Sequence, residues 1–365
     1  MKPYLVEKTT RKVNLHRTLV ASDHLEPKSG GSVAKTLLML LGLSFALSVG
    51  VGVADASTDC EPVGAIRFIC DVVSPEDLAV VPDTNWLIAS GDQEGGRIQL
   101  VNVDDKSATV LFPTSTRTER HDTTAYPTCP GPIDPGEGDE FRAHGLYLEP
   151  GSGGVHVLYV VHHGFRESIE VFELDARADA PALTWIGCAV APEPVGFNSV
   201  VALPGEGLVA TSPQTGDVWE WHAGSGWTQV PGSDDTAPNG LEISSDGRWL
   251  YVAGFAEAKV TRLSRGQTPV QKEVVQLDFR PDNLRMSVDG SVIFAAGPGN
   301  IQTPRDTSVE TSNVAAIDPE TLQVRPIFQH PFIEGFAAST TAIQVGDEIW
   351  LGTFRGARVA YFSIE

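Results

Sequence analysis

The chain has 365 residues, with 26 Lys and Arg against 47 Asp and Glu, which gives a formal net charge of −21 at pH 7. A chain this acidic repels nucleic acid and anionic lipid, so its charge excludes binding to either through a basic surface. Only 20% of the residues are charged, whereas Gly (36) and Pro (25) are frequent and no long 3.6-residue periodicity occurs. This composition predicts an all-β protein.

The N-terminal region has the pattern of an export signal. Residues 1–36 carry seven Lys or Arg and precede the apolar run 37–54. Together with Ala54-x-Ala56 this predicts a signal peptide in residues 1–56. The run of 18 residues is also long enough to remain as a membrane anchor, and a misassigned start codon is a third reading. In the first two readings, residues 57–365 are periplasmic or secreted, or anchored to the inner membrane and facing outward, and the chain meets a membrane only if the run is retained.

The four cysteines, Cys60, Cys70, Cys129 and Cys188, all follow the predicted signal and have no CxxC spacing. In an oxidising compartment we expect one or two disulfides. Three complete pairings are open from the sequence. We favour Cys60–Cys70 with Cys129–Cys188.

A strand–turn–strand unit recurs along the chain. In each copy a small polar cluster leads into a short strand, a turn and an apolar strand that ends in small residues. The six copies are 75–91, 141–164, 197–212, 238–254, 281–297 and 338–354. One such unit cannot bury its own faces, whereas a closed ring of units at a period of roughly 40–60 residues can. The repeat therefore predicts a six-bladed β-propeller.

In chain order, blade one covers 78–112, blade two 144–188 and blade three 199–231. Blade four covers 240–277, blade five runs from SVDGSVIFAAG (287–297) to QVRPIF (323–328), and blade six covers 341–364. Blade six is one strand short, so we expect GAIRFIC (64–70) to pair into it and close the ring, which removes two exposed edges. Two segments rich in Pro and Thr, 114–141 and 298–312, are predicted to be surface loops.

The first strand of each propeller blade lines the central channel, so polar residues at the start of these strands should gather at one end of it. These residues are Glu76, Asp77, His144, Asn198, Asn239, Asp282, Asn283 and Thr340. Taken singly, most of them fit ordinary turns and caps. Their common position in six repeats favours a site instead. Carboxylate and amide oxygens without a thiolate suit Ca²⁺, whereas Zn²⁺ prefers more nitrogen or sulfur.

Two histidines lie close to this predicted site. His144 begins the first strand of blade two and His163 ends the second, so adjacent antiparallel strands bring them together, and we expect a base or proton relay. His162 points to the other face of its strand and is predicted to be structural. No Gly-x-Ser-x-Gly motif occurs. A cation beside a histidine base suits hydrolysis of a carbonyl ester.

Seven motifs follow one another along the chain: SPEDL, FRAHGLYL, LYVVHHGFRESIEVFELD, FNSVVAL, APNGLEISSDGRWLYVA, LDFRPDNLRMSVDG and IWLGTF. Through these motifs, between about Cys60 and Glu365, the chain resembles the paraoxonase/arylesterase family of six-bladed calcium propellers, and more distantly the gluconolactonase and regucalcin-like group. The resemblance implies a catalytic calcium held by Glu76, Asn198, Asn239, Asp282 and Asn283, and a water-activating pair of His144 and His163.

The resemblance also implies a second, structural calcium bound by Asp77, by the main-chain carbonyl of Leu146 and by an Asp after Asn198. Here Ser199 stands at that last position, which weakens the predicted second site. The family's bridge from the N-terminal region to the C-terminal strand lacks its second cysteine. Cys60–Cys70 is an alternative means of holding the N-terminal strand.

The expected function is Ca²⁺-dependent hydrolysis of small-molecule lactones or aryl esters, without a nucleic-acid partner. A sugar-lactone hydrolase of the gluconolactonase type is an alternative enzyme. A non-catalytic propeller that uses calcium for rigidity is the alternative outside enzymes, and a strictosidine-synthase-like lyase or synthase is a weaker one. The physiological substrate and the oligomeric state do not follow from the sequence.

Overall fold

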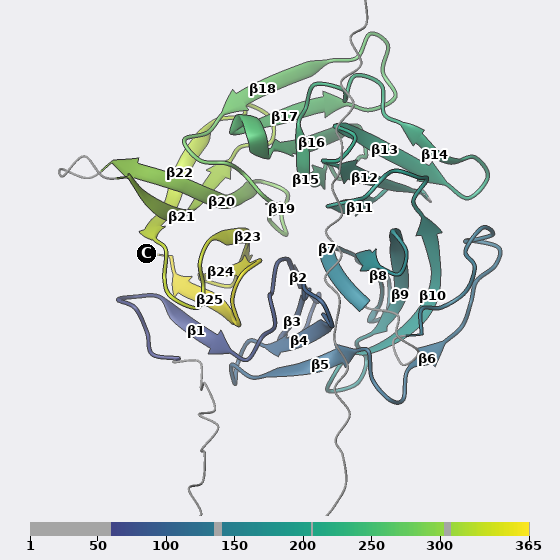
Figure 1. Ribbon diagram of the computed structural model, residues 1–365, viewed down its shortest axis with the longest axis horizontal. Coiled ribbons are helices and arrows are strands. Elements are labelled where there is room, and N and C mark those ends of the chain that lie inside the picture. Colours follow the sequence, from purple (N-terminus) through teal and green to yellow (C-terminus); the bar gives the residue numbers. More distant parts are fainter. Residues whose placement is uncertain (1–59, 135–140, 206, 303–307, 365) are drawn as a thin grey trace, which may run out of the picture. The chain divides into compact units, whose positions relative to one another are not determined.

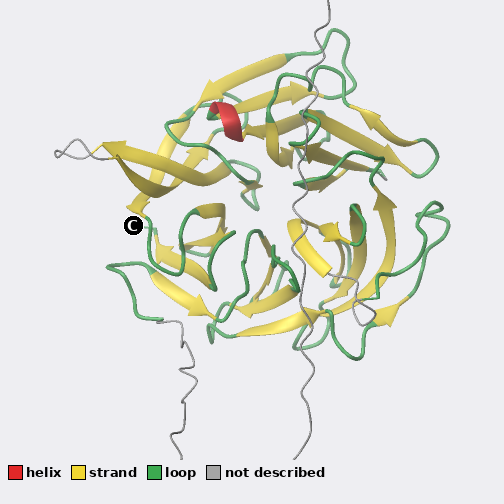
Figure 2. Cartoon of the chain, viewed as in Figure 1, coloured by secondary structure: helices red, strands yellow, loops and turns green. Residues whose placement is uncertain are grey.

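The computed structural model describes residues 60–134, 141–205, 207–302 and 308–364. Their strands form six antiparallel sheets arranged in a ring (Figure 1). The predicted all-β, six-bladed propeller is therefore confirmed. The single helical element among these residues is a 3₁₀ turn, η1 (Phe255–Glu257), and the rest is strand and loop (Figure 2). The predicted signal or anchor in residues 1–56 lies outside the described residues, and none of the described helices is long and apolar enough to cross a membrane.

The blades follow the chain in order. Blade 1 contains β2 (Leu78–Val80), β3 (Trp86–Ala89), β4 (Ile98–Asn102) and β5 (Ala108–Phe112), and blade 2 contains β7 (Phe141–Glu149), β8 (Val155–Gly164), β9 (Ser168–Asp175) and β10 (Ala182–Val190). Blade 3 contains β11 (Val200–Ala202), β12 (Leu208–Ser212), β13 (Asp217–His222) and β14 (Gly226–Gln229), and blade 4 contains β15 (Pro238–Ile243), β16 (Trp249–Gly254), β17 (Lys259–Ser264) and β18 (Lys272–Gln276). Blade 5 contains β19 (Leu284–Met286), β20 (Ile293–Gln302), β21 (Ser308–Ile317) and β22 (Val324–Pro331).

Blade 6 is completed by the N-terminal strand, as the sequence predicts. Its order is β1 (Arg67–Cys70), β25 (Arg358–Ser363), β24 (Glu348–Thr353) and β23 (Ser339–Val345). β1 pairs antiparallel with β25, with Phe68 opposite Ala360. The Cys60–Cys70 disulfide joins the end of β1 to the chain before it. Strands from both ends of the described chain thus share one sheet. This pairing closes the ring and leaves the N-terminal strand β1 with a partner.

The segment 114–141 was predicted to be only a surface loop, and that prediction was wrong in part. β6 (Thr118–Glu119) adds in parallel to the outer strand β10 of blade 2. Tyr126 and Ile133 are buried against the same blade. The second disulfide, Cys129–Cys188, ties the segment to β10, which confirms the favoured pairing. A few apolar side chains and one crosslink are enough to dock a largely polar segment.

The segment 298–312 also differs from its prediction. β20 and β21 continue beyond the blade as a long hairpin, in which Pro298 pairs with Ser312 and Gln302 with Ser308. The tip, 303–307, lies outside the described residues. The Pro and Thr content suggested a loop. Pro298 is tolerated in the paired stretch because its carbonyl accepts from Arg280 N on the side away from β21, so the missing N–H removes no hydrogen bond of the hairpin.

The six first strands are joined around the axis by one hydrogen bond at each junction between blades. The donors and acceptors are Leu146 N to Asp77 Oδ2 (2.8 Å), Gly145 N to Asn198 O (3.2 Å), Leu241 N to Ser199 Oγ (3.2 Å), Gly240 N to Asp282 O (2.9 Å), Asn283 N to Thr340 O (2.9 Å), and Thr340 Oγ1 to Glu76 O (2.5 Å). We call this set the axial ring. It holds the predicted site residues at one level of the propeller.

Two glycines allow the blades to approach closely in the axial ring. A Cβ on Gly145 would lie 2.4 Å from Asn198 O, and a Cβ on Gly240 would lie 2.2 Å from Asp282 O. Both distances are too short for any side chain, so glycine is required by the approach itself. The repeat places these two glycines directly after His144 and Asn239, which brings both residues to the axis.

Candidate active site

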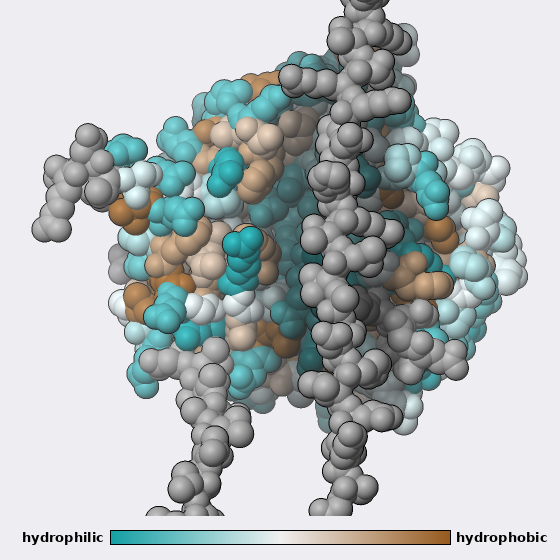
Figure 3. Space-filling model, viewed as in Figure 1, coloured by the Kyte–Doolittle hydropathy of each residue, from teal (hydrophilic) through white to brown (hydrophobic). Residues whose placement is uncertain are grey.

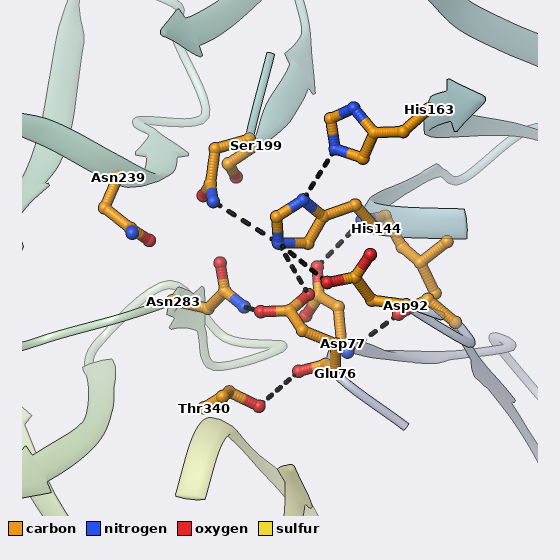
Figure 4. A network of polar contacts seen from close by, with 12 residues as sticks. Glu76, Asp77, Asp92, His144, His163, Ser199, Asn239, Asn283 and Thr340 are labelled. Carbon is orange, nitrogen blue, oxygen red and sulfur yellow. Dashed lines mark hydrogen bonds and ion pairs between the residues drawn. The ribbon is translucent and has the colours of Figure 1, made fainter. Parts of the chain in front are cut away.

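The structure places three of the predicted site residues at irregularities near the start of the first strands. The pairing of β7 with β8 shifts between Ala143 and Leu146, that of β15 with β16 between Pro238 and Leu241, and that of β23 with β24 between Ser339 and Ala342. His144, Asn239 and Thr340 lie within these bulges. A bulge re-aims a side chain that regular pleating would turn into a blade face. The polar residues therefore face the axis, where Figure 4 shows them together.

Four buried oxygen atoms of this cluster have no hydrogen-bond partner among the described residues. They are Glu76 Oε2, Asn198 Oδ1, Asn239 Oδ1 and Asn283 Oδ1. We call them the open oxygens. A buried polar atom without a partner is costly, and four around one axis are not a feature of ordinary packing. A hard cation with oxygen ligands would satisfy all four, so the residues fit the predicted calcium.

The amide groups are oriented by their second atoms. Asn283 Nδ2 donates to Glu76 Oε1 at 2.6 Å, and Asn198 Nδ2 lies 3.3 Å from His144 Nε2. These two amides therefore use their nitrogens within the protein and leave their oxygens open. This arrangement favours a positively charged ligand, because amide oxygens carry the negative end of the dipole.

The carboxylates of the cluster repel one another. Burial raises the pKa of Glu76 well above its usual value, and the charges of Asp77, Asp282 and Asp92 add to this effect. Burial, followed by Asp77 and Asp92, raises the pKa of Asp282 to about 7. Among the described residues neither Glu76 nor Asp282 forms an ion pair with Lys or Arg. No cation of the described chain therefore balances these carboxylates, and without one they retain their protons to higher pH than usual.

Within the described parts of the chain no three His, Cys, Asp or Glu side chains are grouped as a metal site. The predicted set differs from such groups because three of its five members are asparagines. The metal prediction therefore depends on the open oxygens and on the charge, rather than on a cluster of acidic and imidazole ligands.

The two predicted histidines are in contact. His144 Nδ1 lies 2.9 Å from His163 Nε2. His144 Nε2 faces the open oxygens, 3.9 Å from Glu76 Oε2 (Figure 4). Burial lowers the pKa of His144 to about 4; the Asp92 charge opposes this effect and His163 adds to it. His144 is therefore neutral at neutral pH, as a base must be.

Glu167, which the sequence did not single out, extends the histidine pair. Its Oε2 lies 2.7 Å from His163 Nδ1. An ionised carboxylate only accepts hydrogen bonds, so His163 Nδ1 carries the proton and His163 Nε2 accepts from His144 Nδ1. The lone pair of His144 is then on Nε2, which faces the site and also lies 3.3 Å from Asn198 Nδ2, so water must replace this long amide contact when the imidazole acts as a base. Glu167 lies in the turn after β8, and no repeat position marks it.

Asp92 is a second residue that the sequence did not reveal. Its Oδ2 lies 3.8 Å from His144 Nε2, and its Oδ1 accepts from Arg142 Nε at 2.7 Å. Burial raises the pKa of Asp92, but His144 and Arg142 together outweigh it and hold that pKa below its usual value. Asp92 follows the second strand of blade 1, as His163 ends the second strand of blade 2. A comparison of second-strand ends would have found it.

The remaining predicted residues have other surroundings. His162 is fully buried on the opposite face of β8 and stacks on Phe141, with ring centroids 5.2 Å apart. Asp77 and Leu146 are the residues implied for a second calcium. The guanidinium of Arg285 donates hydrogen bonds to the carboxylate of Asp77 and to the main-chain carbonyl of Leu146. On the face seen in Figure 3, hydrophilic residues line the visible part of the central opening.

No protein-family model and no curated protein sequence matches this chain. Solved structures do resemble it. A luciferin-regenerating enzyme is 13% identical with a TM-score of 0.51, over 83% of this chain and 96% of its own. A putative gluconolactonase is 16% identical with a TM-score of 0.50, over 84% of this chain and 94% of its own. At these identities the likeness concerns the fold alone, and this chain shares the six-bladed propeller fold of these two structures.

Proposed function

We propose that this chain is an exported hydrolase of lactones or aryl esters that works with one Ca²⁺ ion at the axial ring. The observation that supports it most is the position of His144 Nε2 beside the open oxygens, 3.9 Å from Glu76 Oε2. A neutral imidazole next to a cation site combines the two groups that ester hydrolysis needs, a base for water and a charge for the carbonyl oxygen.

Five residues would hold the ion: Glu76, Asn198, Asn239, Asp282 and Asn283. Calcium takes six to eight oxygen ligands, so positions remain for water and for a substrate oxygen. When bound there, calcium supplies Lewis-acid polarisation of an ester carbonyl. Two carboxylates against a divalent ion balance the local charge, whereas the protein alone leaves both uncompensated.

The chain's own residues would handle the proton. His144 Nε2 takes a proton from water as the water oxygen bonds to the carbonyl carbon. The imidazolium that forms is held through its Nδ1–H by His163, which Glu167 fixes in the accepting tautomer. When the ester C–O bond breaks, His144 returns the proton to the departing alcohol oxygen, so the base is regenerated.

Two further observations support the substrate class and the location. The motif resemblance to paraoxonase/arylesterase propellers favours lactones and aryl esters, and the putative gluconolactonase of the same fold makes polar lactones worth testing beside apolar ones. The two disulfides fit an oxidising compartment, which supports a periplasmic or secreted protein.

The test is turnover of phenyl acetate, gluconolactone and a long-chain acyl lactone, with Ca²⁺ and after EDTA treatment. We expect activity that EDTA removes and Ca²⁺ restores. The variant His144→Gln should lower kcat by roughly 10²–10⁴-fold while calcium affinity, measured by calorimetry, is retained. The adjacent His162→Gln is the matched control and should keep kcat, because that ring lies on the other face of β8.

Two outcomes would overturn the proposal. If EDTA lowers the thermal stability but no ester or lactone is turned over, the chain is a calcium-stabilised binding propeller. If His144→Gln loses calcium to the same extent as Glu76→Gln, the histidine is a ligand or a structural residue, and the assigned role of base is wrong.

A further inference from the structure

Arg285 is a buried cation beside the candidate site. Its side chain is 9% exposed, and it extends from β19 in blade 5 to residues of blades 1 and 2. Its guanidinium donates to Asp77 Oδ2, to Leu146 O at 2.7 Å and to Leu78 O at 3.2 Å. One arginine thus joins three blades around the axis.

Two of these partners are the residues that the motif resemblance assigns to a second calcium, and they do not fit one here. Asp77 Oδ1 accepts from Leu78 N at 2.9 Å, and Asp77 Oδ2 accepts from both Leu146 N and Arg285. The Leu146 carbonyl is also taken. In contrast to the open oxygens, every oxygen of this pair already has a donor.

The third implied ligand is missing as well. At position 199 the chain has a fully buried serine, whose Oγ accepts from Leu241 N at 3.2 Å as part of the axial ring. One carboxylate and one carbonyl are few ligands for a divalent ion. A second ion would also lie in contact with a guanidinium, and the repulsion between them is strong in a buried site.

We propose that Arg285 takes the place of a second divalent cation. The structural cation of this chain is then a side chain of the protein, and the chain binds a single metal ion. The guanidinium supplies a permanent positive charge and several donors in one plane, and therefore can hold a carboxylate and main-chain carbonyls from different blades at once. The inference goes beyond the proposed function, which concerns only the open oxygens.

The test counts ions. The purified protein is dialysed against Ca²⁺, and bound calcium per chain is measured by elemental analysis. We expect one ion in the wild type. The double variant Arg285→Ser with Ser199→Asp removes the fixed cation and supplies the missing carboxylate, so it should bind one ion more than the wild type. The single variant Ser199→Asp is the matched control and should gain none, because the guanidinium still fills the position.

The possible counts separate this inference from the proposed function. Two ions in the wild type overturn the inference, with or without the variants. A folded double variant, checked by circular dichroism, that gains no ion also overturns it. No ion in the wild type but one in the double variant supports the role of Arg285 and instead overturns the calcium at the open oxygens. If the double variant does not fold, the wild-type count decides.

Discussion

Glu76 and Asp77 are neighbours in sequence, and both carboxylates are buried at the axial ring, yet their surroundings are opposite. Glu76 Oε2 is one of the open oxygens, and no Lys or Arg of the described chain pairs with it. Asp77 is saturated by two backbone donors and by Arg285. Both positions thus have a carboxylate and both are buried. What separates a ligand position from a structural one is whether the protein supplies the positive charge itself.

The largest expected effects come from neutralising each carboxylate in turn. Glu76→Gln should abolish calcium binding and activity without lowering the free energy of unfolding of the metal-free protein, because burial and the neighbouring carboxylates already penalise the charged form that the substitution removes. Asp77→Asn should keep calcium affinity but lower that free energy by about 3–5 kcal/mol, because Arg285 is left unpaired. Calorimetric calcium titration and urea unfolding in EDTA measure both. Equal loss of calcium in the two variants would contradict the contrast.

A smaller effect is expected from Glu167, which positions the pair of His144 and His163 beside the open oxygens. Glu167→Gln should lower kcat by roughly tenfold with KM unchanged, because the tautomer of His163 is no longer fixed by a charge. The acid limb of the kcat profile should also move to lower pH, since the imidazolium of His144 loses the support of a carboxylate. An unchanged profile with a lower melting temperature would show that Glu167 is merely structural.

The last effect concerns the pH dependence of stability in the metal-free protein. In the metal-free protein the pKa of Asp282 is raised to about 7 by burial and by the neighbouring carboxylates. Between about pH 4 and 7 the folded state therefore binds more protons than the unfolded state, and the free energy of unfolding falls as the pH rises, by about 1.4 kcal/mol per pH unit from this group.

The measurement is the free energy of unfolding of the wild type and of Asp282→Asn in EDTA as a function of pH. The difference between the two proteins isolates the contribution of Asp282 from those of the buried histidines, which act in the opposite direction. The wild type should lose stability relative to the variant as the pH is raised from 5 to 7. Saturating Ca²⁺ should remove the dependence. A constant difference between the two proteins across this range would show that Asp282 is already charged without metal.

The repeat made most of the fold and the predicted ligand positions readable from sequence. Glu76, Asn198, Asn239 and Asn283 occupy the same place in different copies, and the ring geometry turns a common place in the repeat into a common place in space. The closure by residues 64–70 followed from counting strands. These predictions needed no knowledge of side-chain packing, because the ring geometry of the propeller alone brings equivalent repeat positions together.

Arg285, Asp92 and Glu167 show where sequence reasoning ended. In the sequence, Arg285 is the middle residue of a short first strand, Leu284–Met286, and nothing in the repeat marks it. Only the structure reveals that its side chain reaches Asp77, which is 208 residues away. Asp92 and Glu167 lie after second strands, in turns whose conformation the repeat does not fix. The docked segment around Tyr126 was missed because few apolar residues are needed to attach it to an existing blade edge.

The axial ring has a consequence for when the candidate site can form. Its donors and acceptors come from all six blades, from Glu76 to Thr340, and the final sheet needs a strand from each end of the propeller. No stretch of the chain shorter than residues 76–340 contains all the members of the axial ring. A nascent polypeptide therefore cannot complete the axial ring until its last blade has been synthesised and β1 has paired with β25, so the candidate site is assembled at the end of folding.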